Sequence, residues 1–204
     1  MNFTRGVLAS TAAALFLASS AQAAVISVSF AGAPVSVPNN IDGVYFDFVK
    51  GTRSSTEFNG YDFNPYNNGS GLTFYGAAAA SGILATGTPG TTAQARVLQF
   101  GDLISSSGQY NQYQTRGDSF EINGQEYVGL RFFNEATGIL NYGWALMKTT
   151  AGNGFPAAVL AYGYENTGLS ITAGQTAAEV PEPGSFALMG LALGALAFLR
   201  RRKA

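Results

Sequence analysis

Short runs of alternating apolar and polar residues fill the central part of the chain, and Gly, Asn and Ser separate them. Apolar side chains at every second position are typical of β-strands, whereas a helix would repeat them every three or four residues. The runs that predict strands are Val25–Phe30, Gly43–Val49, Leu72–Tyr75, Arg96–Phe100, Ser119–Ile122, Glu126–Phe133, Gly138–Lys148, Pro156–Glu165 and Ser170–Thr172. The pattern therefore predicts an all-β domain.

A tight turn is predicted at Asn123-Gly124, between the runs Ser119–Ile122 and Glu126–Phe133. Both residue types tolerate the positive φ that a two-residue hairpin turn needs, so the pair predicts a β-hairpin. The run Gly138–Lys148 follows after four more residues and continues the meander. Successive short connections favour antiparallel pairing, and the earlier runs suffice for a second sheet. We expect an antiparallel β-sandwich of jelly-roll or lectin-like form.

The run Gly138–Lys148 places large and small side chains on opposite faces. Leu140, Tyr142, Trp144 and Leu146 share one face, and Asn141, Gly143 and Ala145 share the other. Tyr142 and Trp144 are tentative glycan contacts, because aromatic rings can stack on sugar rings. The favoured interpretation is that both rings fill the core of the sandwich, where an alternating aromatic strand belongs.

The first 23 residues have the organisation of a secretory signal peptide. Arg5 supplies a positive charge, Val7–Ala18 is a short apolar stretch, and Ala21-Gln22-Ala23 places small residues where signal peptidase needs them. We expect cleavage between Ala23 and Ala24. The apolar stretch is short of the roughly 20 residues that span a bilayer, which disfavours a permanent anchor.

The last 25 residues combine three features in a fixed order. Pro181-Glu182-Pro183 cannot be helical, because proline fixes φ, lacks an N–H and disfavours helix at the residue before it. Ser185–Leu199 is uncharged and apolar, and is expected to form a single hydrophobic helix. The basic cluster Arg200-Arg201-Arg202-Lys203 then keeps the chain end on the cytoplasmic side of a membrane.

This C-terminal order resembles the PEP-CTERM sorting signal. The resemblance implies a Gram-negative host that makes exopolysaccharide, recognition of Pro181-Glu182-Pro183 by the membrane enzyme exosortase, and removal of the tail. A plain C-terminal membrane anchor is the alternative. The expected organisation is a signal peptide at 1–23, a β-sandwich at 24–175 and a sorting tail at 176–204. Phrases between Glu126 and Gly174 also resemble the C-terminal half of other PEP-CTERM proteins, a likeness that carries no activity with it.

Charge and composition exclude several classes of function. Residues 24–179 carry six basic and eleven acidic residues, a net charge of −5, so the domain repels phosphate backbones and nucleic-acid binding is not expected. The chain has no Cys and no His, which excludes disulfides, Ser-His-Asp triads and the usual zinc sites. We expect no catalytic residue, no cofactor and no bound metal, with weak Ca²⁺ binding through Asp62 left open.

Two other groups of residues are candidates for a binding or catalytic role. The segment Asn59–Gly71 gathers Asn, Asp and Tyr, and a solvated loop is favoured over a Ca²⁺ or sugar site. A carboxylate pair for glycoside cleavage could come from Glu121, Glu126, Glu135 and Glu165, although carboxylates near turns are usually only solvated. Arg131, in the middle of a strand, is expected to form an ion pair.

These features together predict an exported, non-enzymatic protein of the cell surface or the exopolysaccharide matrix. Exosortase is the expected partner, and the membrane holds the chain before processing. The alternative is a carbohydrate-binding module that acts on extracellular glycan, and a glycan-processing enzyme is the third possibility.

Overall fold

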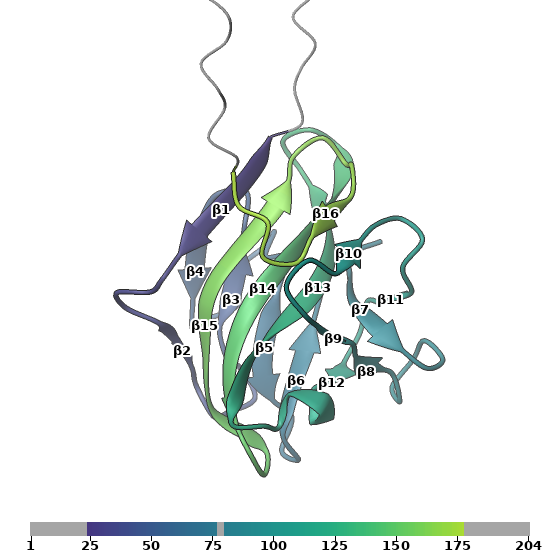
Figure 1. Ribbon diagram of the computed structural model, residues 1–204. Helices are drawn as coiled ribbons and strands as arrows, with labels where there is room; N and C mark the ends of the chain where they lie inside the picture. The colour runs from purple at the N-terminus through teal and green to yellow at the C-terminus, as the bar shows by residue number, and fades with distance from the viewer. Residues whose placement is uncertain (1–23, 77–79, 178–204) are drawn as a thin grey trace, which may run out of the picture.

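The computed structural model describes residues 24–76 and 80–177, and strands make up about half of this part of the chain (Figure 1). Its helical content is a single 3-10 turn, η1 (Asp118–Phe120). The strands are β1 (Val25–Ser29), β2 (Val35–Val37), β3 (Tyr45–Asp47), β4 (Thr52–Ser54), β5 (Asn64–Asn67), β6 (Leu72–Tyr75), β7 (Gly82–Thr86), β8 (Gln94–Ala95), β9 (Val97–Leu98), β10 (Leu103–Ile104), β11 (Tyr110–Asn111), β12 (Thr115–Arg116), β13 (Gly124–Asn134), β14 (Ile139–Thr150), β15 (Gly154–Glu165) and β16 (Ile171–Thr172). The predicted all-β class is confirmed.

The three longest strands, β13, β14 and β15, form an antiparallel meander at the centre of the fold. β1 and β2 extend it along β15, while β7 and β9 pair with β13. From β7 the sheet continues through β8, β12 and β6 to β5, so that 12 strands form one sheet. The sheet curls, and its far strands lie across from the meander (Figure 1). Pairing is antiparallel except between β8 and β12. The jelly-roll or lectin-like form stays a prediction.

The main core lies between the meander and the curled part of the sheet. Phenylalanines from the β3, β5 and β6 regions pack against aliphatic side chains of the meander, and Phe63 touches Phe46, Phe48 and Phe74 with ring centroids 5.7–6.3 Å apart. Such offset aromatic contacts add stability beyond the buried area itself. The alternating residues Val128, Leu130 and Phe132 of β13 all point into this core.

The meander is covered on its other face as well. Tyr142 and Trp144 belong to a second apolar cluster, whose other members come from β7, the β9–β10 region and the β16 region: Leu84, Leu98, Ile104, Ile171 and Ala173. Both faces of β14 are therefore buried. Trp144 is 3% exposed, and its indole N–H donates to the Gln175 carbonyl at 3.1 Å. A Cβ at position 163 would lie 2.7 Å from the indole ring, so glycine there gives the ring its space.

β15 contains a β-bulge at Leu160. Leu146 of β14 is opposite Ala161, but the next residue, Met147, is opposite Val159, so Leu160 has no partner on β14. Its carbonyl instead accepts a hydrogen bond from Phe30 N–H at 2.7 Å, in the gap between β1 and β2. The extra residue shifts the alternation by one, so Val159 and Tyr162 both face the main core.

The predicted hairpin at Asn123-Gly124 is wrong. Phe120 is completely buried in the main core, and the chain around it forms the 3-10 turn η1 instead of a strand. Hydrogen bonds from Phe120 N–H to Gly117 O and from Glu121 N–H to Asp118 O close this turn. One anchoring ring replaces the alternation that a strand would need, and Ile122 remains partly exposed. Gly124 begins β13, which pairs with β14.

The expectation of a solvated loop at Asn59–Gly71 is also wrong. Residues 61–66 are buried, and β5 begins among them. The Asn64 side chain donates to the carbonyls of Asp42 and Val44, at 2.8 and 3.1 Å. Side chains such as that of Asn64 satisfy neighbouring backbone groups, which lets a polar sequence enter the interior.

The described domain begins and ends at the same end of the molecule (Figure 1). Ala24 exchanges hydrogen bonds with Asn166, from Ala24 N to the side-chain oxygen and from Asn166 N to the Ala24 carbonyl, both at 3.2 Å. Within residues 24–76 and 80–177, none of the helical structure has the length and hydrophobicity needed to cross a membrane.

Candidate functional site

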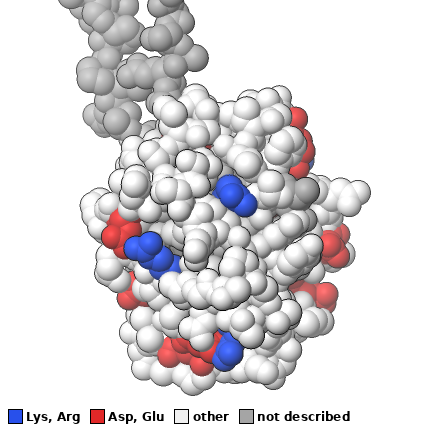
Figure 2. Space-filling model, turned by 90° about the vertical axis from the view of Figure 1, so that its right-hand side faces the viewer, with Lys and Arg blue, Asp and Glu red and all other residues white. Residues whose placement is uncertain are grey.

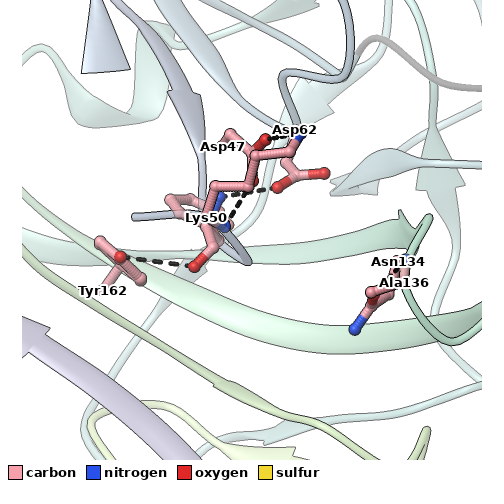
Figure 3. Close-up of polar contacts among 7 residues, drawn as sticks. Asp47, Lys50, Asp62, Asn134, Ala136 and Tyr162 are labelled. Carbon is pink, nitrogen blue, oxygen red and sulfur yellow. Dashed lines mark hydrogen bonds and ion pairs between the residues drawn. The ribbon is translucent and has the colours of Figure 1, made fainter. Parts of the chain in front are cut away.

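Two buried aspartates hold the tight turn between β3 and β4. Asp47, at the end of β3, accepts hydrogen bonds from the backbone N–H and the ammonium of Lys50, at 2.8 and 2.6 Å. The hydrogen bond to Asp47 raises the pKa of Lys50. Asp62 approaches from the start of the neighbouring segment, and its Oδ2 accepts the Phe48 N–H at 2.8 Å. Figure 3 shows Asp47, Asp62 and Lys50 converging on this turn.

Among the acidic groups described, Asp62 has the most strongly shifted pKa. It is 4% exposed, and its second oxygen, Oδ1, is buried without a hydrogen-bond partner. Burial raises the pKa of this carboxyl to about 8, helped by the nearby charges of Asp47 and Glu135, while the Phe48 N–H and Lys50 act in the opposite direction. The carboxyl is therefore largely neutral at pH 7, and a neutral acid can be buried at much lower cost than an anion.

A groove of about 300 Å³ lies beside this turn. Its walls combine acidic and aromatic residues, among them Glu57, Phe58, Tyr61, Tyr75 and Glu135. The Tyr61 ring meets the Phe58 ring edge-on, at 6.3 Å between centroids, and burial raises the Tyr61 pKa. The edge-on contact between the two rings stabilises their arrangement. We name this hollow the aromatic groove.

A second hollow, of about 400 Å³, lies between the β5–β6 turn and η1. Its lining is mostly polar, and we name it the polar cleft. The residues that line it are Asn68, Ser70, Gly71, Leu72, Thr73, Thr91, Gln114, Arg116, Asp118 and Glu121. Sequence reasoning missed this cleft, since its walls come from segments about fifty residues apart and no local motif joins them.

The four glutamates that were candidates for a catalytic pair have different surroundings in the structure. Glu165 is buried and accepts hydrogen bonds from Thr167 and Leu169. Glu126 accepts one from Gln99 at 2.8 Å. Glu135 lines the aromatic groove and Glu121 the polar cleft. The hairpin that would have brought Glu121 and Glu126 together does not exist.

The tentative glycan contacts Tyr142 and Trp144 are buried, at 7% and 3% exposure. Tyr127 meets the Trp144 ring edge-on and Tyr110 lies against Tyr142, so both rings are occupied by protein. This placement agrees with the packing interpretation and corrects the tentative one: neither ring offers a face on which a sugar could stack.

Arg131 does not form the expected ion pair. Its guanidinium lies over the Tyr110 ring, 4.5 Å from the centroid, and donates to the Ala80 carbonyl. The two ion pairs found in the described part of the chain are Lys50–Asp47 and Arg116–Asp118. Within the same residues, no three Asp or Glu side chains group closely enough to hold a metal ion.

Charged side chains are sparse on the surface. On the face that Figure 2 shows, single basic residues are separated by wide uncharged areas, and no basic cluster appears. This agrees with the net negative charge of the central region and offers nothing that would attract a phosphate backbone.

The signal-peptidase positions Ala21 and Ala23, the motif Pro181-Glu182-Pro183, the hydrophobic segment Ser185–Leu199 and the basic cluster Arg200–Lys203 lie outside the described residues. Residues 179–203 match the family model of the PEP-CTERM protein-sorting motif. No curated protein and no solved structure matches the chain.

An all-β domain joined to such a tail defines an exported protein that exosortase processes during its passage through the membrane. More particularly, the chain is a PEP-CTERM domain-containing protein, in agreement with the resemblance of its last 25 residues.

Proposed function

We propose that the β-domain acts without catalysis, as a protein of the cell surface or the exopolysaccharide matrix to which exosortase delivers it. The observation that carries this proposal is the complete sorting motif at residues 179–203. Such a tail determines the destination of the domain but says nothing about its activity. The evidence on activity therefore has to come from the domain itself.

Two features of the domain support a role without catalysis. The chain has neither His nor Cys, the residues that most often act as general base or covalent nucleophile. The most perturbed acid, Asp62, lies beneath the β3–β4 turn and holds it, with Phe48 N–H as its partner. Its carboxyl is 4% exposed and has no access to a substrate.

The proposal predicts a specific failure when the sorting motif is damaged. Glu182→Ala should leave the precursor intact in the inner membrane, because exosortase recognition is lost while Ser185–Leu199 and the basic cluster still hold the chain. Each basic residue costs about 2.5–3.5 kcal/mol at the bilayer centre on insertion scales. Mass spectrometry of the C-terminal peptide from the native host, on membrane, cell-surface polysaccharide and medium fractions, measures the outcome.

The unaltered protein should lack its tail and appear in the polysaccharide or medium fraction. Thr176→Ala, six residues upstream and outside the matched residues 179–203, serves as the control and should be processed normally. An unaltered protein that keeps Ala204 and stays in the inner membrane would refute the proposal and favour a plain tail anchor.

A carbohydrate-binding module is the second candidate function. The polar cleft favours it, since amide, hydroxyl and carboxylate groups around a hollow of about 400 Å³ provide the hydrogen bonds that sugar hydroxyls need. This candidate is compatible with the first, because a matrix protein can be held in place by the polymer it binds.

A further inference from the structure

We propose that the polar cleft binds a saccharide unit that carries no acidic group, and that it presents this site at the end of the domain farthest from the sorting tail. The inference rests on the proposed function, in which the domain works outside the membrane. It adds the site, the class of ligand and the direction in which the site points.

The lining of the cleft determines the class of ligand. Ser70, Thr91 and Gln114 contribute hydroxyl and amide groups, and no protein partner for these side-chain groups is found in the described part of the chain. Asn68 uses its Oδ1 to accept the Ser70 N–H at 2.9 Å, which leaves its amide N–H groups available. Hydrogen-bond donors and acceptors that lie so close together match a polyhydroxylated ligand. The lining contains a single leucine, which gives too little apolar surface to bind an apolar ligand.

The charges in the cleft determine which saccharides fit. Arg116 and Asp118 form a two-point ion pair, with Nε donating to Oδ1 at 3.2 Å and a second contact between Nη2 and Oδ2. Arg116 is thus already neutralised. Glu121 has no ion pair, and burial together with the charge of Asp118 raises its pKa. The three groups leave one negative charge, which repels uronic acids and other acidic sugars.

Gly71 allows the two walls to approach one another. A Cβ at this position would lie 2.4 Å from the Glu121 Oε1 and 3.3 Å from the Asn153 carbonyl. A side chain here would push the carboxylate away. The cleft therefore depends on the β5–β6 turn passing close to η1, with the Glu121 carboxylate between them.

The position of the cleft gives the site its direction. The β5–β6 turn, η1 and the β14–β15 turn lie together at one end of the domain, and Leu72 N–H donates to the Asn153 carbonyl at 2.9 Å (Figure 1). The domain begins and ends at the opposite end, where the aromatic groove also lies beside Glu135. Until exosortase removes the tail, a domain held by it therefore turns the polar cleft away from the membrane, and after processing the cleft remains at the end of the domain opposite its C-terminus.

Glycan binding by the full-length exported protein tests the inference. The probes are an array of neutral, amino and uronic-acid oligosaccharides, together with polysaccharide extracted from the native host. The unaltered protein should bind neutral glycans and discriminate against uronic acids. Gln114→Ala should weaken neutral binding about tenfold, the cost of roughly one hydrogen bond to the ligand. Glu121→Gln should keep neutral binding and lose the discrimination, because it removes the charge and preserves the shape.

Glu57→Gln, in the aromatic groove at the other end of the domain, is the matched control and should change neither affinity nor selectivity. The near-ultraviolet circular dichroism of the buried Trp144 verifies that each variant is folded. Absence of binding to every neutral glycan and to the host polysaccharide would overturn the inference, as would a loss in Glu57→Gln equal to that in Gln114→Ala. Failure here with normal processing and delivery refutes the cleft alone, whereas retention in the inner membrane refutes the proposed function.

Discussion

Asp62→Asn should remove a large part of the pH dependence of folding stability. The pKa of Asp62 is raised from 3.8 to about 8 in the folded protein. As pH rises above 3.8, the unfolded chain releases this proton while the folded chain keeps it, so the stability that the group contributes at low pH declines until the folded carboxyl also ionises. At 1.36 kcal/mol per unit, the decline between pH 4 and pH 7 is about 4 kcal/mol.

Urea unfolding of the two proteins at pH 4, 5.5, 7 and 8.5 measures this effect. The free energy of unfolding of Asp62→Asn, relative to that of the unaltered protein, should rise by about 4 kcal/mol between pH 4 and 7. The comparison of pH values removes any constant cost of the new amide. Asp42→Asn, at an exposed position, should leave the profile unchanged. Parallel profiles for Asp62→Asn and the unaltered protein would show that the carboxyl is not buried as described.

Phe63→Ala should lower the free energy of unfolding by about 3–5 kcal/mol. Its ring is completely buried and touches three other phenylalanines, so truncation leaves a cavity that rigid neighbours cannot fill. For a domain whose total stability is of the order of 5–15 kcal/mol, this loss is severe. Chemical denaturation of the two proteins at one pH gives the difference.

Phe100→Ala is the matched control, since it removes the same ring from a position that is 76% exposed. It should cost less than about 0.5 kcal/mol. Phe63 lies in the segment that composition alone assigns to a solvated loop, so the experiment decides between the two descriptions of Asn59–Gly71. Similar small effects for both variants would favour the loop.

Long elements could be predicted from the sequence, because each carries enough alternation to stand out. β13, β14 and β15 coincide closely with predicted runs, and the burial of Trp144 followed from the aromatic face of one of them. Strands of two to four residues, such as β5 and β8, are too short for a periodic signal. Their pairing depends on neighbours far along the chain.

The candidate sites also differ in how far they could be predicted from the sequence. The sorting motif is contiguous, so its proline pair, apolar stretch and basic cluster could be recognised in one pass. The polar cleft combines Asn68 with Glu121, and the turn at Asp47 combines Lys50 with Asp62, through contacts that only the folded chain creates. The Asn123-Gly124 pair misled because Phe120, three residues before it, is a single buried anchor and does not belong to a strand.

The bulge at Leu160 determines which residues of β15 face the main core. Residues before and after it face the main core only because one residue is counted out. Deleting Leu160 would remove the bulged residue and keep Val159 and Tyr162 on the core face, because the paired residues on either side of it retain their alternation. Deleting a residue beyond the bulge, such as Gly163, would instead turn Tyr164 away from the main core and towards the side of Trp144. β15 therefore tolerates the loss of one residue at the bulge but not beyond it.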